Sequence, residues 1–263
     1  MSYPIIILVD EKTLMGAEDD RHLLREDLDL NVSFMNWRTL DPRMIQGAKA
    51  VVMRSPYSYI DDPVLFIEHV QSIEDSGCVV LNPVEVVRWN MHKQYLIQMR
   101  DQFDVNVPSM VLSKTPIVSE EDVLALLDQH LCSHDEYVIV KPAISGGAND
   151  TFKISLNNYR DNLQGILNAG FGTDREYIIQ QYVSTIETEG ELSLIFLGGK
   201  FSHAIRKVPT REDFRVQAMF GGRNLLEKSV DPQAMRFGEL IIDALNKIFP
   251  KDVSSKILYS RID

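Results

Sequence analysis

The chain has 263 residues, of which 44% are hydrophobic and 25% charged, a composition typical of soluble globular proteins with one large or two to three small domains. With 27 lysine and arginine residues against 38 aspartate and glutamate residues, the formal net charge is −11, which argues against nucleic-acid binding because that needs clustered cations. The two cysteines lack the pattern of a disulfide framework, the first residues lack the cationic region of a signal peptide, and no apolar run is long enough to span a membrane, so we expect a cytoplasmic protein without a membrane partner.

The first 80 residues alternate short apolar segments with segments of helical spacing. The apolar segments are rich in β-branched residues and lack polar alternation, as strands buried on both faces of a sheet do. Because strands that alternate with helices form parallel sheets, this part predicts an α/β, doubly wound domain. The expected strands are 4–10, 31–37, 48–55 and 77–83, and the expected helices are 17–30 and 64–75.

From residue 137 onward the strands follow one another closely, which predicts an antiparallel, α+β second half. A long helix is expected before it at about 84–102, and a second at 119–130, where Ser119 and two glutamates form a helix-start signal. Asp231 and Pro232 are typical of the cap and first position of a helix, here over 231–249. The expected strands are 137–142, 151–155, 176–183, 191–199, 200–208, 213–220 and 256–263, with "LGGK" as a hairpin turn.

The segment "YVIVKPAISGGANDTF" joins a buried strand that ends on Lys141 to a loop containing Gly146 and Gly147. Glycines and small residues let backbone amides approach an anion closely, so the lysine and the loop together suit phosphate binding. A solvated lysine and an ordinary hairpin connection are the alternatives. The loop is neither GxxxxGK[ST] nor GxGxxG, and the acidic "DEKTLMGAEDD" after the first strand would repel a pyrophosphate, so an NAD-dependent oxidoreductase is not favoured.

Six segments, in this order, resemble the ATP-grasp ligases: "RSPYSY", "NPVEVVRWNMHKQYL", "VIVKPAISGGANDTF", "IIQQYV", "IETEGELSLIFLGGKFSHAIRK" and "DFRVQAMFGG". The likeness is to the bacterial glutathione-synthetase-like branch, which includes the D-cycloserine-forming ligase, and it covers nearly the whole chain. It implies an ATP-grasp fold, with a Rossmann-like N-terminal domain at 1–108, a small lid subdomain at 109–183 and an antiparallel C-terminal ATP-grasp subdomain at 184–263.

The resemblance implies how the phosphates of ATP are held. Lys93 corresponds to the lysine that reaches the α-phosphate, although a solvated helix lysine is the alternative, and Lys141 to the lysine that bridges the α- and β-phosphates. The mobile loop that closes over the β- and γ-phosphates is implied at Ser145, Gly146 and Gly147.

The resemblance also implies how the nucleoside is held. Gln180, Gln181 and Val183 correspond to the linker whose backbone groups read the adenine edge, with the Gln180 side chain contributing; a simple core strand is the alternative. Glu189 corresponds to the acidic residue that accepts hydrogen bonds from the ribose. Glu191, two residues further on and expected on the same strand face, is a further polar residue expected to line the site.

Four charged residues are implied around the transferred phosphoryl group. Lys207 and Arg215 correspond to cations that hold the γ-phosphate or an acyl phosphate, and two cations in one cleft would supply a positive field against the net charge of −11. Surface cations are the alternative for both. Arg261 is a further phosphate contact, and Asp263 corresponds to the first magnesium-binding carboxylate.

The implied activity is that of an ATP-dependent ligase that uses ATP and Mg²⁺. The γ-phosphate would pass to a small amino-acid-like carboxylate, and an amine or similar nucleophile would displace phosphate from the acyl phosphate. Arg54, Tyr57 and Tyr59 are candidate substrate contacts, with packing at a strand end as the alternative. The expected partners are therefore small molecules, and related ligases are often homodimers.

Two further expectations concern metals. ATP-grasp ligases supply two more magnesium ligands downstream of the position of Asp263, where this sequence ends, so we expect either a truncated enzyme, which we favour, or a catalytically degenerate ATP- or ADP-binding protein. His130, Cys132 and His134 lie close together but lack a second ligand pair at zinc-site spacing, so no zinc site is expected there.

Overall fold

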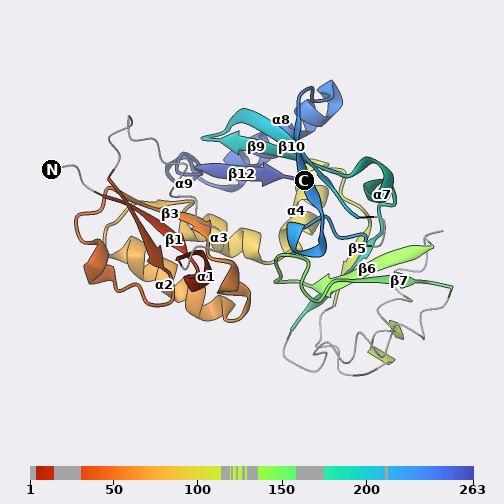
Figure 1. Cartoon of the computed structure of the whole chain (residues 1–263), viewed down its shortest axis with the longest axis horizontal. Helices are drawn as coiled ribbons and strands as arrows, with labels where there is room; N and C mark the ends of the chain where they lie inside the picture. Colours follow the sequence, from red (N-terminus) through yellow and green to blue (C-terminus); the bar gives the residue numbers. More distant parts are fainter. Residues whose placement is uncertain are drawn as a thin grey trace. The chain divides into compact units, whose positions relative to one another are not determined.

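The computed structural model describes residues 4–14, 31–113, 136–157, 175–210 and 213–263, and Ser119, Glu121, Asp122, Leu124, Ala125 and Asp128. The helix expected at 17–30 and the segment 130–135 lie outside these residues, as does most of the helix expected at 119–130. The chain divides into two compact units (Figure 1): unit 1 is Met1–Trp89, Phe196–Lys200 and Leu245–Ser260, and unit 2 is Asn90–Ile195, Phe201–Ala244 and Arg261–Asp263. The three-part division at residues 108 and 183 stays a prediction.

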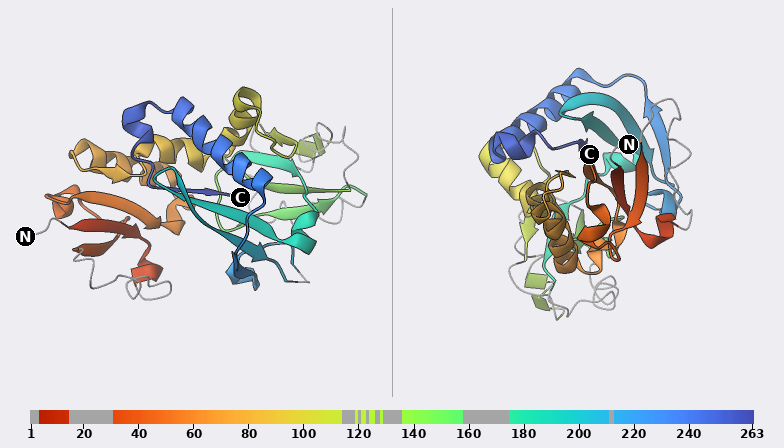
Figure 2. Two further views of the ribbon diagram at one scale, coloured as in Figure 1. Left: turned by 90° about the horizontal axis from the view of Figure 1, so that it is seen from above. Right: turned by 90° about the vertical axis from the view of Figure 1, so that its left-hand side faces the viewer.

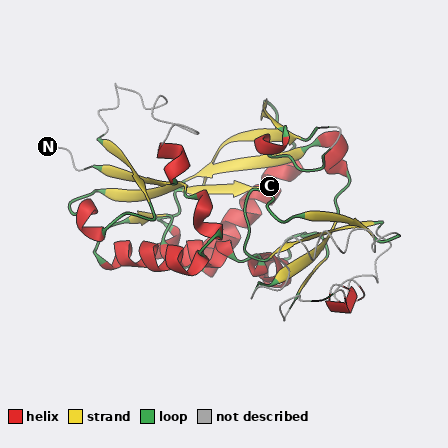
Figure 3. Ribbon diagram, turned by 60° about the horizontal axis from the view of Figure 1, so that its bottom comes forward, coloured by secondary structure: helices red, strands yellow, loops and turns green. Residues whose placement is uncertain are grey.

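Unit 1 contains a parallel sheet in the order β2-β1-β3-β4, which confirms the sequence-based prediction. The strands are β1 (Ile5–Val9), β2 (Val32–Asn36), β3 (Ala50–Ser55) and β4 (Val80–Leu81). Helix α2 (Pro63–Asp75) begins after Asp62, whose carboxylate accepts from the Leu65 N–H at 3.0 Å, and it buries Phe66, Val70 and Ile73. Helix α2 lies along one face of the sheet (Figure 3). Unit 1 also contains the short helices α1 (Glu11–Leu14), η3 (Pro42–Ile45), η4 (Tyr57–Ile60) and α9 (Lys251–Ser254).

The helix predicted at 84–102 is two helices, α3 (Val84–Met91) and α4 (Gln94–Phe103). The break has a local cause. The Lys93 N–H donates to the Ala143 carbonyl at 2.9 Å, and His92 forms an isolated antiparallel β-bridge with Ile144. The His92 ring also accepts from the Gln94 N–H at 3.2 Å. Because these groups bond outside the helix, the main chain leaves the helical path at His92, and Lys93 is the N-cap residue of α4.

The first sheet of unit 2 is antiparallel, in the order β5-β8-β6-β7. Its strands are β5 (Met110–Leu112), β6 (Tyr137–Pro142), β7 (Phe152–Ser155) and β8 (Tyr177–Gln181). One face forms a core of Val138, Val140, Ile154, Tyr177 and Ile179, all fully buried. Alternation then places Lys141 and Gln180 together on the opposite face, since Lys141 pairs with Ile178 and Gln180 with Ile139.

The other antiparallel sheet has the order β11-β10-β9-β12, formed by β9 (Glu191–Leu197), β10 (Lys200–Val208), β11 (Arg223–Glu227) and β12 (Tyr259–Ile262). The predicted hairpin turn is confirmed at Gly198–Gly199. Helix α8 (Pro232–Ile248) lies along one face of this sheet (Figure 2). Its predicted start is confirmed, because the Asp231 carboxylate accepts from the Gln233 N–H at 2.7 Å. No described helix is both long and apolar enough to cross a membrane.

The strand predicted at 213–220 is wrong. This stretch is a loop that ends in the 3₁₀ helix η5 (Ala218–Phe220), and the strand comes later, as β11. Local hydrogen bonds explain the difference: the Gln217 carbonyl accepts from the N–H groups of Phe220 at 2.9 Å and Gly222 at 3.2 Å, and Gly221 has φ 84°. The alternating apolar residues therefore line a compact turn instead of a sheet.

Candidate functional site

Lys93 is held against the glycine loop of unit 2. Its Nζ donates to the Ser145 carbonyl at 3.0 Å and to Ser145 Oγ at 2.8 Å. The loop continues through Gly147, Ala148 and Asp150 in left-handed conformations, with φ of 64°, 57° and 50°. The structure thus brings together Lys93 and the loop of Ser145, Gly146 and Gly147, which the sequence placed far apart.

Lys141 lies on β6 and its Nζ donates to Gln180 Oε1 on β8 at 2.8 Å. Burial lowers the pKa of Lys93 to about 7, with a further contribution from the charge of Lys141. Burial also lowers the pKa of Lys141 to about 8, against the opposing charge of Glu191. Among the described residues, no carboxylate forms an ion pair with either ammonium group.

Lys93 and Lys141 are partly buried and repel each other, and within the described part of the chain their ammonium groups bond only neutral oxygens. No ion pair between described residues therefore offsets the cost of removing these two charges from water. Desolvation of an ammonium is unfavourable unless an anion accompanies it. A phosphate chain supplies several anionic oxygens, each of which favours the charged form of a neighbouring lysine. The pair is therefore suited to an anionic ligand.

A pH dependence follows from these pKa values. An anion that binds at Lys93 and Lys141 raises their pKa, so binding at pH 8 is expected to take up roughly one proton, and affinity should fall as the pH rises from about 7 to 9. Titration calorimetry with ADP in two buffers of different ionisation enthalpy measures the uptake. The variant Lys93→Met should take up less, and a binding heat that is the same in both buffers at pH 8 would contradict the expectation.

A second charged cluster lies where β9, β10 and β12 meet. Lys207 Nζ donates to Glu191 Oε1 at 2.7 Å and to Asp263 Oδ1 at 3.0 Å, and its side chain is only 12% exposed. Ser193 Oγ also bonds Asp263 Oδ1, and Arg261 Nε donates to Asp263 Oδ2 at 3.0 Å. Burial raises the pKa of Asp263, but Arg261 and Lys207 outweigh it and hold the pKa below the usual value.

Asp263 is the residue expected to bind magnesium. Both of its oxygens already accept hydrogen bonds from a cation, Oδ1 from Lys207 and Oδ2 from Arg261. No group of three or more histidine, cysteine, aspartate or glutamate side chains in the described part of the chain could hold a metal ion. Magnesium needs octahedral oxygen ligands, so this arrangement does not fit it, and the assignment of Asp263 stays a prediction.

Arg215 is held by its own loop. Its guanidinium donates from Nη2 to Asp213 Oδ2 at 2.6 Å and from Nε to Asp213 Oδ1 at 3.0 Å, and its Cζ lies 3.5 Å from the centroid of the Phe220 ring. The hydrogen bonds that the Arg215 guanidinium donates to the Asp213 carboxylate raise the pKa of Arg215 and lower the pKa of Asp213. Arg215 is therefore a fixed, partly buried cation.

The residues predicted to bind the nucleoside differ in their backbone bonding, exposure and secondary structure. Gln181 N–H donates to the Ser109 carbonyl at 2.8 Å, and the Val183 carbonyl accepts from the Ile186 N–H at 3.2 Å. Val183 itself is 38% exposed. The shared strand face predicted for Glu189 and Glu191 is wrong: Glu189 ends helix α7 (Thr185–Glu189), Gly190 turns the chain with φ 76° and ψ 177°, and Glu191 begins β9.

The candidate substrate residues Arg54, Tyr57 and Tyr59 belong to unit 1, whereas all the others belong to unit 2. Arg54 lies on β3 and the tyrosines on η4. The Tyr59 ring packs at a tilt against Phe66, with ring centroids 5.6 Å apart, and burial raises the pKa of Tyr59, which supports packing for this residue. Tyr57 is 53% exposed. Their role in substrate binding stays a prediction.

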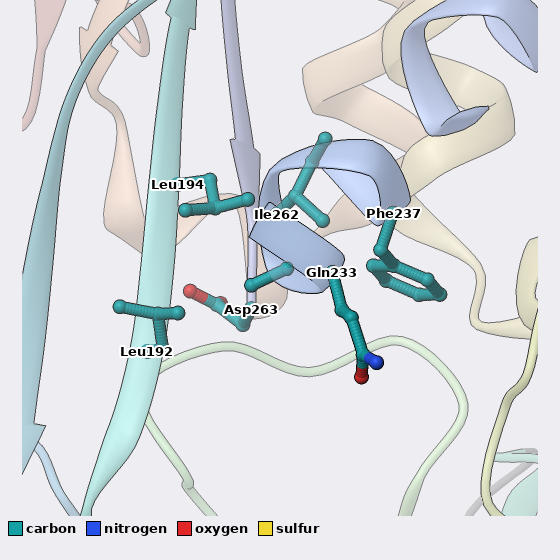
Figure 4. A pocket seen from close by; sticks show the side chains of 7 residues that line it. Leu192, Leu194, Gln233, Phe237, Ile262 and Asp263 are labelled. Atoms are coloured by element: carbon teal, nitrogen blue, oxygen red, sulfur yellow. The ribbon is translucent and has the colours of Figure 1, made fainter. Parts of the chain in front are cut away.

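A cavity of about 370 Å³ lies between α8 and the sheet, lined by Leu192, Leu194, Gln233, Ala234, Phe237, Ile262 and Asp263 (Figure 4). Leu192 and Leu194 alternate along β9 with Glu191 and Ser193, so the leucines lie on the other face of the strand. Asp263 belongs to both places, because it lines the cavity and also bonds Lys207 and Arg261. The cavity is therefore a largely apolar space that borders the charged cluster at Asp263.

The sequence missed Ser193, Asp213 and Phe220 as members of these clusters. Asp213 had a local signal, since it stands two residues before Arg215 and a carboxylate at that spacing can turn back on the guanidinium. Ser193 was detectable only by alternation with Glu191, and Phe220 was assigned to a strand that does not exist.

The sequence model of the prokaryotic glutathione synthetase ATP-grasp domain matches residues 103–248. The cycloserine biosynthesis protein DcsG of Streptomyces lavendulae is 26% identical over 161 residues, which are 60% of this chain and 52% of DcsG, so the match spans about half the length of that relative.

Two solved structures are similar in fold. The crystal structure of D-cycloserine synthetase DcsG superposes with a TM-score of 0.76 at 19% identity, covering 94% of this chain and 82% of that one. The D-alanine–D-alanine ligase of Bacillus anthracis in complex with ATP has a TM-score of 0.64 at 14% identity, covering 100% of this chain and 81% of that one. At these identities the likeness concerns the fold alone.

Proposed function

The chain belongs to the prokaryotic glutathione synthetase family of ATP-grasp proteins, and on that premise we propose that it is an ATP-dependent ligase that joins a small amino-acid-like carboxylate to an amine or similar nucleophile. The observation that carries the proposal is the pair Lys93 and Lys141, two partly buried cations without a carboxylate partner among the described residues. The triphosphate of ATP supplies the anions that this pair lacks.

The proposed binding mode assigns each cluster a task. Lys93 and Lys141 hold the phosphate chain, and the loop of Ser145, Gly146 and Gly147 closes over it and excludes water. The ammonium of Lys93 bonds the Ser145 carbonyl and hydroxyl oxygens, and a phosphate oxygen that binds Lys93 would replace them. Gln180, beside Lys141, would face the nucleoside.

The proposed chemistry is phosphoryl transfer followed by acyl transfer. A substrate carboxylate oxygen attacks the γ-phosphorus, the bond to the β-phosphate oxygen breaks, and ADP leaves. The nucleophile then attacks the acyl carbon, and phosphate leaves with the bonding electrons. Lys207 and Arg215 would compensate the charge on the transferred group, which is the main contribution a protein makes to phosphoryl transfer.

A ligand panel tests the nucleotide step. ATP and ADP, each at about 100 times Kd, are expected to stabilise the protein by about 2.7 kcal/mol in calorimetric melting, whereas NAD at the same concentration should not. If neither ATP nor ADP shifts the melting temperature, the proposal is wrong.

Phosphate release tests the ligase step. Pairs of amino acids and small peptides are added with ATP, and release is expected only when an acid and a nucleophile are both present. ATP binding that gives no phosphate with any pair would instead support a nucleotide-binding protein without turnover, the alternative raised by the sequence.

A further inference from the structure

We infer that Asp213 and Phe220 are positioning residues, which fix Arg215 so that the Nη1 side of its guanidinium faces the terminal phosphate of ATP. The inference rests on the proposed function and goes beyond it, because it assigns a task to two residues that touch neither nucleotide nor substrate.

Asp213 occupies the Nε–Nη2 edge of the guanidinium. Its Oδ2 accepts from Nη2 at 2.6 Å and from Nε at 3.1 Å, and its Oδ1 accepts from Nε at 3.0 Å and from the Arg215 backbone N–H at 2.9 Å. A guanidinium has five N–H donors in a rigid plane. Among the described residues, nothing accepts a hydrogen bond from Nη1, so this side of the plane keeps its donors.

Phe220 occupies one face of the same plane. The Cζ of Arg215 lies 3.5 Å from the Phe220 ring centroid, well inside the range of a cation–π contact, whereas the ring of Phe214 is 6.0 Å away. With one edge and one face fixed, the guanidinium has little freedom to rotate. The direction of its Nη1 donors is therefore set before a ligand arrives, which removes the loss of side-chain freedom that arginine otherwise suffers on binding.

The loop is built to bring Phe220 back over Arg215. The Phe220 N–H donates to the Gln217 carbonyl at 2.9 Å, and the chain then turns through Gly221 at φ 84°. A Cβ on Gly222 would lie 2.1 Å from the Val216 carbonyl oxygen, so the returning chain touches the residue directly after Arg215. This close packing makes the position of the Phe220 ring a property of the fold.

The charge of Asp213 separates two explanations for Arg215. If Arg215 acted only as a point charge, a carboxylate beside it would weaken phosphate binding, and removing that carboxylate would strengthen it. If Asp213 acts by orienting the guanidinium, removing its charge and one acceptor oxygen weakens the contact with the terminal phosphate. The two explanations therefore predict opposite signs for the same substitution.

The measured quantity is the ratio of ATP to ADP affinity, from titration calorimetry on the full chain. In the unsubstituted protein ATP should bind more tightly than ADP, and Arg215→Lys should remove that preference because lysine lacks the fork. Asp213→Asn and Phe220→Leu are each expected to weaken ATP binding about tenfold and to leave ADP binding unchanged. Phe220→Tyr, which keeps the ring, should restore the preference.

Phe214→Leu is the matched control, since it makes the same chemical change next to the same guanidinium but at the outer limit of a cation–π contact. It should leave the ratio unchanged. In the Arg215→Lys background, Asp213→Asn should have no further effect on the ratio.

Unchanged ADP affinity in the variants shows that the fold is intact, and Phe220→Leu tests the inference if Asp213→Asn does not fold. The inference is overturned if Asp213→Asn tightens ATP binding or leaves the ratio as it is. Failure of the unsubstituted protein to bind either nucleotide is a different result, which rejects the proposed function itself.

Discussion

The variant Lys141→Met is expected to lose the stabilisation by ATP and ADP and yet to be more stable than the original protein when no nucleotide is present. Loss of a charge-assisted contact to two phosphates should weaken ATP binding roughly 100-fold or more. Without nucleotide, however, the desolvated ammonium of Lys141 lowers the free energy of unfolding, because burial disfavours its charged form and lowers its pKa to about 8.

The sign of the stability effect follows from the pKa values. The pKa of Lys141 is about 10.5 in an unfolded chain and about 8 in the folded one, so the unfolded state binds more protons between these values and stability rises with pH there. Below pH 8 the full penalty of about 3 kcal/mol is present. Loss of the hydrogen bond to Gln180 Oε1 opposes the gain, which leaves a net stabilisation of about 1–2 kcal/mol at pH 7.

Calorimetric melting at pH 7 and pH 10, with and without ATP, measures both effects, and the gain should be smaller at pH 10. Lys153→Met is the matched control, because the Lys153 ammonium lies 2.5 Å from Glu187 and 4.0 Å from the Tyr182 ring centroid. The same substitution should lower stability there. A Lys141→Met variant that is less stable than the original protein at pH 7, or that ATP stabilises as strongly, would show that the lysine is not held for an anion.

The second large effect is expected for Gly190→Ala. Gly190 has φ 76° and ψ 177°, a region that is essentially restricted to glycine, and a Cβ there would lie 2.6 Å from the Lys207 carbonyl oxygen. Strain and the clash with backbone together should lower the free energy of unfolding by about 3 kcal/mol or more. Because the displaced strands carry Glu191 and Lys207, ATP binding should weaken as well.

Gly198→Ala separates the effect of backbone strain from the effect of a steric clash. Gly198 also has a positive φ, of 55°, but a Cβ there meets nothing within 4 Å. It should lower the free energy of unfolding by only about 1 kcal/mol. Urea unfolding with unchanged m-values measures both variants. Equal effects of the two substitutions would show that the contact between a Cβ at position 190 and the Lys207 carbonyl oxygen adds nothing to the backbone strain.

Much of the fold could be predicted because its signals are local. Strand β1 is a continuous apolar run, and α8 begins at Pro232 after its cap Asp231, as the sequence indicates. The errors arose where distant residues compete for the backbone. Ala143 takes the hydrogen bond of the Lys93 N–H and breaks a helix whose apolar spacing continues through it, and nothing near Lys93 in the sequence announces this.

In the candidate site, too, local features could be predicted from the sequence, and contacts between distant residues could not. Residue types and order pointed to Lys93, Lys141 and the glycine loop, and the structure brings them together. What each side chain bonds could not be predicted, because it depends on register. Asp263 illustrates this: strand pairing places it between Lys207 and Arg261, which is visible only once β9, β10 and β12 are adjacent.

The two tryptophans of the chain provide a built-in spectroscopic label for one unit. Trp37 packs edge-on against Phe66, and Trp89 against Phe249, and all four belong to unit 1. Intrinsic indole emission during unfolding therefore follows unit 1 alone, whereas far-ultraviolet circular dichroism follows both. If the emission and circular dichroism curves coincide, the two units unfold as one cooperative block. If the units unfold independently, ATP is expected to move the two curves further apart.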